Sequence, residues 1–254
     1  MKKRSPAKRW GCAALALILT LWSLPALAQQ STAEQAIDRF LELSAAEGLL
    51  SAEGQALRSG EALEWDTPTF GPLPAHADLI QTIDDRHAVA RVTATAPDGH
   101  QLDLYFYLTD ADGWRVEAMR TLAMTGLIFE VREMLRAQES LSDEEAATLR
   151  NLELTLSTDA TLKAWFNAHR QDLTALVQDQ QAGAALAALR TRAEALDLEV
   201  VHAVDGRVEV VIGGMVDNTV GFLKAGPDGP PAISPSAFIW IEALGDGWYL
   251  FRTT

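Results

Sequence analysis

The chain has 254 residues, of which 48% are hydrophobic and 22% charged, and its formal net charge at pH 7 is −14. This length allows one large domain or two modest ones with hydrophobic cores of their own. So acidic a chain repels phosphate backbones and anionic lipid surfaces, which excludes nucleic-acid binding as an expected function.

Residues 1–28 have the pattern of a secretory signal peptide. Their basic residues are Lys2, Lys3, Arg4, Lys8 and Arg9. An apolar run, Ala13–Leu24, is followed by Pro25 and by the small residues of Ala26–Ala28, so we predict cleavage after Ala28 and a periplasmic or secreted protein. The alternative is a retained membrane anchor, which needs about 20 apolar residues.

Cleavage at this position changes what the remaining chain can do. It removes five positive charges and no negative ones, so the formal charge falls from −14 to −19. It also removes Cys12, the single cysteine, which excludes disulfides and thiol catalysis. No later stretch is long and apolar enough to span a membrane.

Residues 29–122 are predicted to form helices followed by an antiparallel sheet. The expected helices are Thr32–Gly48 and Ser51–Arg58, and the expected strands are Leu79–Ile83, His87–Ala96, Leu102–Leu108 and a strand from Trp114. Proline and glycine make residues 67–76 a surface connector. Asp110–Gly113 resembles the start of a calcium loop, but a hairpin turn is favoured because Trp114 begins a strand where ligands are needed.

Residues 123–254 repeat this order, with a helical segment followed by a second sheet. The expected helices run from Leu127 to Leu135, from Ser142 toward Leu156, from Ser157 or Thr158 to Val177, and from Ala184 to Leu196. The expected strands are Val200–Val204, Val208–Ile212, Phe238–Ile241 and Trp248–Phe251. In the connector between the second and third of these strands, Gly213-Gly214 indicates a bulge or a close backbone approach, and residues 217–219 indicate either a recognition loop or a turn.

These patterns predict an α+β protein built from two modules, each with helices followed by an antiparallel meander. The two sheets match in sequence only around Asp-Gly-Trp and in the pairs Arg120-Thr121 and Arg252-Thr253. The distance from the tryptophan to the Arg-Thr pair differs by two residues between the modules, so duplication is only weakly indicated. Trp114 and Trp248 are interpreted as packing anchors, and Trp165 and Phe166 as core residues.

Sequence motifs for several reaction types are absent. The chain lacks a Gly-x-Ser-x-Gly elbow, phosphate-binding or dinucleotide glycine loops, and a His-Glu-x-x-His pair. Its histidines do not have the spacing of metal ligands; they are His76, His87, His100, His169 and His202. We therefore expect neither a metal nor a cofactor.

The strongest polar cluster lies on the first predicted sheet. Alternation along the strands places His87 and Arg91 on faces of the same parity as Tyr105 and Tyr107. In an enclosed pocket, His87 could act as a general base and Tyr105 or Tyr107 as a hydrogen-bond donor to a developing oxyanion. Asp85, Arg91 and Asp103 are the candidate ligand-binding residues. The favoured interpretation is a solvated outer face, as is common in antiparallel sheets.

Residues 32 to about 122 resemble the NTF2-like (cystatin-like) superfamily. The resemblance rests on an amphipathic helix, a short second helix, and a meander whose last strand opens on Asp112, Gly113, Trp114, Arg115 and Val116. It implies a curved sheet and a function in either of two classes, isomerases and dehydratases or non-catalytic binding and assembly domains. The sequence from residue 217 to the end resembles exported bacterial proteins of uncharacterised function.

The leading hypothesis is an exported, non-enzymatic protein that binds a small ligand or another protein. The alternative is a small-molecule enzyme of NTF2-like type, an isomerase or a hydrolase, with the His/Tyr/Asp pocket described above. A third hypothesis is a structural role in an envelope assembly, which an exposed apolar patch on the second sheet would favour. The sequence leaves the oligomeric state open.

Overall fold

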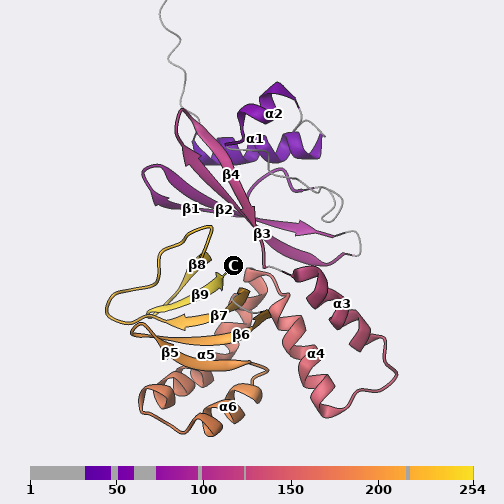
Figure 1. Ribbon diagram of the computed structural model, residues 1–254, viewed down its shortest axis with the longest axis vertical. Coiled ribbons are helices and arrows are strands. Elements are labelled where there is room, and N and C mark those ends of the chain that lie inside the picture. Colours follow the sequence, from indigo (N-terminus) through magenta and orange to yellow (C-terminus); the bar gives the residue numbers. More distant parts are fainter. Residues whose placement is uncertain are drawn as a thin grey trace, which may run out of the picture. The chain divides into compact units, whose positions relative to one another are not determined.

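The computed structural model describes residues 32–46, 51–59, 73–96, 99–122, 124–215 and 218–253 (Figure 1). The predicted signal peptide lies outside these residues, as does most of the predicted connector 67–76. Ser31–Thr254 form one compact unit. Its helices and two antiparallel sheets make it an α+β protein, as predicted. None of the described helices is long and apolar enough to cross a membrane.

The first two helices begin where the sequence predicts. Thr32 caps α1 (Ala33–Ala45) in a capping box with Gln35, and Ser51 caps α2 (Ala52–Ala56). The buried face of α1 includes Phe40, whose ring lies 5.8 Å from that of Phe106 in the first sheet. Burial of this face attaches α1 to the sheet.

The first sheet is an antiparallel meander in the order β1-β2-β3-β4. Its strands are β1 (Leu79–Asp84), β2 (His87–Thr95), β3 (Gln101–Asp110) and β4 (Trp114–Arg120). Ala88, Ala90, Val92 and Ala94 lie in the core that α1 covers, which confirms the predicted alternation along β2. Asp110–Gly113 forms the predicted hairpin turn.

Four helices follow the first sheet: α3 (Thr125–Arg136), α4 (Asp143–Thr155), α5 (Asp159–Gln181) and α6 (Leu186–Glu194). Ser142 and Glu145 form a capping box at the predicted start of α4, and Thr158 caps α5. On α5, Leu162, Phe166 and Leu173 are buried against the second sheet, which confirms the prediction that Phe166 belongs to the core.

The second sheet differs from the simple meander that the sequence predicts. Its strands are β5 (Val200–Val204), β6 (Arg207–Met215), β7 (Asn218–Lys224), β8 (Phe238–Gly245) and β9 (Trp248–Thr253), in the order β5-β6-β7-β9-β8. The predicted connector between the second and third strands thus contains an additional strand, and β9 is inserted between β7 and β8 (Figure 1). Asn218 and Thr219 begin β7, so both predicted alternatives, a recognition loop and a turn, are wrong for them. Asp217 lies outside the described residues.

Gly221 is the reason that β7 escapes detection in the sequence. A glycine normally interrupts a strand pattern, but here the backbone of β6 approaches so closely that a side chain could not be accommodated. A Cβ atom at position 221 would lie 2.3 Å from the carbonyl oxygen of Val210. The glycine therefore allows the strands to pack closely at the centre of the sheet.

Candidate functional site

The polar face of the first sheet is buried rather than solvated. Arg91 pairs with Tyr105 across β2 and β3, as the predicted parity requires. Tyr105 is fully buried, and its ring lies 5.1 Å from that of Trp240 on β8. The hydroxyl of Tyr107 donates to the carbonyl oxygen of Ile239, 2.7 Å away. The favoured interpretation of this face as solvent-exposed is therefore wrong, because the second sheet covers it.

Asp159 is the centre of a buried ion network between the two sheets. It is the first residue of α5 and is fully buried. Its carboxylate accepts hydrogen bonds from the Tyr105 hydroxyl at 2.9 Å, from Arg252 Nε at 2.9 Å and from Arg91 Nη1 at 3.4 Å. Arg252 also donates through Nη2 to the carbonyl oxygen of Ser157 at 2.7 Å. A single carboxylate thus joins α5 to both sheets.

Two further carboxylates complete this inter-sheet network. Asp103 accepts from the Thr93 hydroxyl at 2.8 Å and from the backbone N–H of Asp159 at 2.6 Å. Glu242 accepts from Arg91 at 2.9 Å and from Lys163 at 2.6 Å. Asp159 and Glu242 thus pair with the cations of Arg91, Lys163 and Arg252, as expected for charges held away from water, whereas the two donors to Asp103 are neutral.

Burial determines the protonation of the network. It raises the pKa of the Asp103 carboxyl, because a charged form is disfavoured away from water and because the neighbouring Asp159 carboxylate repels a second negative charge. Burial also raises the pKa of Tyr105 well above its ordinary value. The pKa of Tyr107 is raised for the same reason. Both tyrosines thus remain neutral hydrogen-bond donors over the physiological range.

The other predicted site residues do not join this network. His87 begins β2, its side chain is 47% exposed, and its Nδ1 pairs with Asp84 at 2.9 Å. Asp85 is exposed in the adjoining turn. Across the sheet His87 faces Thr109, whereas Tyr105 faces Arg91. The structure thus brings Arg91, Asp103 and Tyr105 together but leaves His87 and Asp85 at the solvent edge.

Sequence reasoning missed Asp159, Lys163, Glu242 and Arg252. For Arg252 a signal was present: Trp248, Leu250 and Arg252 alternate along β9 and all three are buried. An arginine in the apolar register of a strand indicates a buried partner for its charge. Asp159 carries no such signal, because an acidic residue in the first turn is common in any helix.

A second candidate region is the outward face of α3. In the described part of the chain, the large hydrophobic side chains that are exposed are Met124 (50%), Leu127 (41%), Met134 (59%) and Leu186 (71%). Three of these four belong to α3 or its N-cap, and half-buried Val131 lies between Leu127 and Met134. Their spacing of three, four and three residues places Met124, Leu127, Val131 and Met134 along one side of the helix, which we call the α3 stripe.

An apolar pocket borders the α3 stripe. It has a volume of about 350 Å³ and is lined by Leu127, Ile128 and Val131 of α3, together with Leu152 of α4 and Met215 of β6. Glu199 is the acidic residue of its lining. The adjoining side of α3, with Ile128 and Leu135, is buried in the protein. The α3 stripe and this pocket, which we call the α3 pocket, therefore form a continuous apolar surface open to a partner.

No protein-family model, curated protein or solved structure matches this chain. The resemblance of residues 32 to about 122 to the NTF2-like superfamily accordingly stays a prediction.

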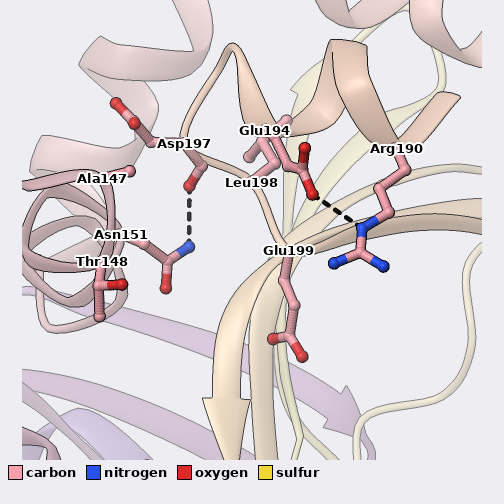
Figure 2. A pocket seen from close by; sticks show the side chains of 8 residues that line it. All are labelled: Ala147, Thr148, Asn151, Arg190, Glu194, Asp197, Leu198 and Glu199. Atoms are coloured by element: carbon pink, nitrogen blue, oxygen red, sulfur yellow. Dashed lines mark hydrogen bonds and ion pairs between the residues drawn. The ribbon is translucent and has the colours of Figure 1, made fainter. Parts of the chain in front are cut away.

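The more polar pockets are lined by groups that bind one another. The pocket between α4 and α6 has a volume of about 260 Å³ (Figure 2). In it, Asn151 donates to the carbonyl oxygen of Asp197 and Arg190 pairs with Glu194, while no interaction joins Glu199 to the other labelled residues. A pocket of about 380 Å³ contains Arg132 and Arg136, which are paired with Glu133 and Glu153. Within the described residues, no group of three or more His, Cys, Asp or Glu side chains is placed to hold a metal ion.

The raised pKa of Asp103 predicts a specific pH dependence of stability. Between the ordinary aspartate pKa of about 3.9 and the raised value, the folded protein holds more protons than the unfolded chain. The contribution of Asp103 to stability therefore falls as the pH rises through this window. In Asp103→Asn the side-chain amide keeps the shape of the carboxyl group. Its oxygen can still accept from the backbone N–H of Asp159, and its NH2 group can donate to the Thr93 hydroxyl. We expect the stability of the wild type relative to this variant to decrease from pH 4 toward neutrality, measured by urea unfolding.

The control for this experiment is Asp85→Asn, which neutralises an exposed carboxylate outside the inter-sheet network. Its stability difference from the wild type should vary less with pH over the same range. Parallel wild-type and Asp103→Asn curves, or a difference that grows with pH, would contradict the raised pKa.

Proposed function

We propose that this chain is an exported, non-enzymatic protein that acts by binding another protein through the α3 stripe. The observation that carries this proposal is the concentration of exposed apolar side chains on one side of α3, next to an apolar pocket. Several large apolar side chains exposed side by side, next to an apolar pocket, are typical of an interaction site. Binding of a partner would remove this surface from water.

The inter-sheet network supports the non-enzymatic part of the proposal. A general acid or base needs access to a substrate, whereas Tyr105, Asp103 and Asp159 are buried and hydrogen-bonded to one another or to arginine. His87, the proposed base of the enzyme hypothesis, lies at an exposed strand end and pairs with Asp84. The arrangement favours a role of this network in holding the sheets together.

The export part of the proposal rests on the N-terminal sequence. A basic segment, an apolar run and the small residues before Gln29 support cleavage after Ala28 and a periplasmic or secreted location. The proposed binding surface is not the one that the envelope-assembly hypothesis requires, which is an exposed apolar patch on the second sheet. The exposed large hydrophobic side chains of the described chain belong to α3, its N-cap and α6, not to the second sheet.

Native mass spectrometry of the protein, isolated gently from its own cells, tests the proposal. We expect a chain that begins at Gln29, carries no small-molecule adduct and is associated with a second protein. Leu127→Glu should abolish the association, because it places a charge in the centre of the α3 stripe. Leu186→Glu is the matched control, since it alters the exposed leucine on α6 and should leave the association intact. A retained small molecule, or an association that is equal in both variants, would contradict the proposal.

A further inference from the structure

The chemistry of the partner can be inferred from the charges around the α3 stripe. Glu130 is exposed on α3, three residues after Leu127 and four before Met134, so it lies beside the stripe. Glu199 lines the α3 pocket. Neither carboxylate forms an ion pair within the described residues, although many other charged side chains of the chain do. The apolar surface is thus bordered by negative charge without a compensating cation.

The arginines of α3 do not change this balance. Arg132 is buried and pairs with Glu133 at 2.8 Å, and Arg136 pairs with Glu153 at 2.7 Å. Their positive charges are already neutralised by their own neighbours. A partner that approaches the α3 stripe therefore meets the carboxylates of Glu130 and Glu199, in a chain whose formal net charge is −14.

The dimensions of the surface favour a short helical segment. α3 has 12 residues, which corresponds to a length of about 18 Å. A spacing of three and four residues on a helix matches the apolar side of a second helix packed along it. Met124 and Met134 have flexible side chains, which adapt to the shape of a bound partner. The α3 pocket, at about 350 Å³, has room for an aliphatic side chain of that partner.

A second copy of this chain fits the surface less well. Self-association through α3 would bring two such acidic borders together, and like charges at an interface oppose binding. The observations thus favour a different molecule with the opposite charge.

We propose that the α3 stripe and the α3 pocket bind a cationic amphipathic helix of a partner protein. Aliphatic side chains of this helix lie along Leu127, Val131 and Met134 and enter the pocket, and its lysine or arginine side chains pair with Glu130 and Glu199. This inference rests on the proposed function, because it assigns the partner of the same surface.

Fluorescence anisotropy with two labelled synthetic helices tests the inference. One peptide carries leucine at helical spacing with lysine at the remaining positions, and the other carries glutamate in place of every lysine. At physiological ionic strength we expect the lysine peptide to bind the purified protein at least about tenfold more tightly than the glutamate peptide. Met134→Glu, at an exposed position that tolerates a charge, should weaken binding of the lysine peptide about tenfold.

Two control variants separate this site from general attraction to an acidic protein. Leu186→Glu adds the same charge on α6 and should change the affinity by less than about twofold. The double variant Glu130→Lys/Glu199→Lys should reverse the preference between the two peptides. Equal binding of the lysine peptide to the wild type and Met134→Glu would overturn the inference.

Failure of this inference is distinguishable from failure of the proposed function. If the lysine peptide does not bind while a protein still co-purifies in a Leu127-dependent manner, the surface is correct and the partner chemistry is wrong. If sedimentation velocity shows a dimer that Met134→Glu dissociates, the occupant is a second copy and the inference is overturned.

Discussion

Replacing Arg252 by methionine should lower the free energy of unfolding by about 3 to 5 kcal/mol, because it leaves a buried carboxylate without its main cation. Asp159 is fully buried and receives the Nε–H of Arg252 at 2.9 Å. The substitution also removes the donor to the carbonyl oxygen of Ser157. Methionine fills much of the volume of arginine, so the loss reports the charge rather than a cavity. Urea unfolding followed by tryptophan fluorescence measures the effect.

Arg120→Met is the matched control. Arg120 stands in the Arg-Thr pair of the first sheet, as Arg252 does in the second. It donates to the carbonyl oxygens of Pro235 and Met119 and is only partly buried, so its loss should cost about 1 kcal/mol. Asp159→Asn removes the buried charge, and in that background Arg252→Met should cost less than in the wild type. Equal costs in both backgrounds would show that the ion pair does not account for the loss.

The local features of the fold could be predicted from the sequence because they depend on residues close together in the chain. The helix starts at Thr32 and Ser142 and the alternation along β2 need only a few neighbouring residues, and the structure confirms them. The strand order of the second sheet depends on pairing between distant segments. The sequence does not reveal that β9 lies between β7 and β8, because local periodicity carries no information on which strands are neighbours.

The candidate site was predictable to the same degree. Arg91, Asp103 and Tyr105 could be grouped because strands that follow one another pair in a hairpin register. Their partners across the network are Asp159 and Glu242, which are far away in sequence. A polar sheet face is interpreted as solvated unless another element covers it. Here the second sheet covers it, and local sequence patterns do not predict which distant segment packs on a sheet.

The α3 stripe illustrates a similar limit. The apolar residues from Leu127 to Leu135 predict a helix, and at 3.6 residues per turn they form one arc of about a third of its circumference. Ile128 and Leu135, at one edge of this arc, are buried, whereas Leu127 and Met134, at its other edge, are exposed. Helical periodicity identifies the arc but does not determine which part of it packs against the protein.

Substitution of Gly213 should also lower the free energy of unfolding markedly, because α4 packs closely against β6 at this residue. Asn151 of α4 donates its amide to the carbonyl oxygen of Ile212 at 2.6 Å, which holds the helix against the strand. A Cβ atom at position 213 would lie 2.4 Å from Thr155 Oγ1 and 3.0 Å from Asn151 Oδ1. The strand pairing also shifts by one residue between Val211 and Gly213, which confirms the bulge, one of the two alternatives predicted for Gly213-Gly214.

Gly213→Ala should therefore lower the free energy of unfolding by about 1 to 3 kcal/mol, since a methyl group is forced into a packed contact. Gly126 provides the matched control: no atom lies within 4 Å of a Cβ placed there, so Gly126→Ala on α3 should be neutral or slightly stabilising.

Thr155→Ala identifies the atom responsible for the loss. The Thr155 hydroxyl is buried without a hydrogen-bond partner among the described residues, so its removal alone should change stability little. In the double variant Gly213→Ala/Thr155→Ala, the shortest contact is gone and only the approach to Asn151 Oδ1 stays tight. The double variant should then recover more than half of the loss, measured as the coupling in a double-mutant cycle of urea unfolding. If Gly213→Ala costs the same with and without the Thr155 hydroxyl, the close approach of α4 to β6 is not the reason for glycine at this position.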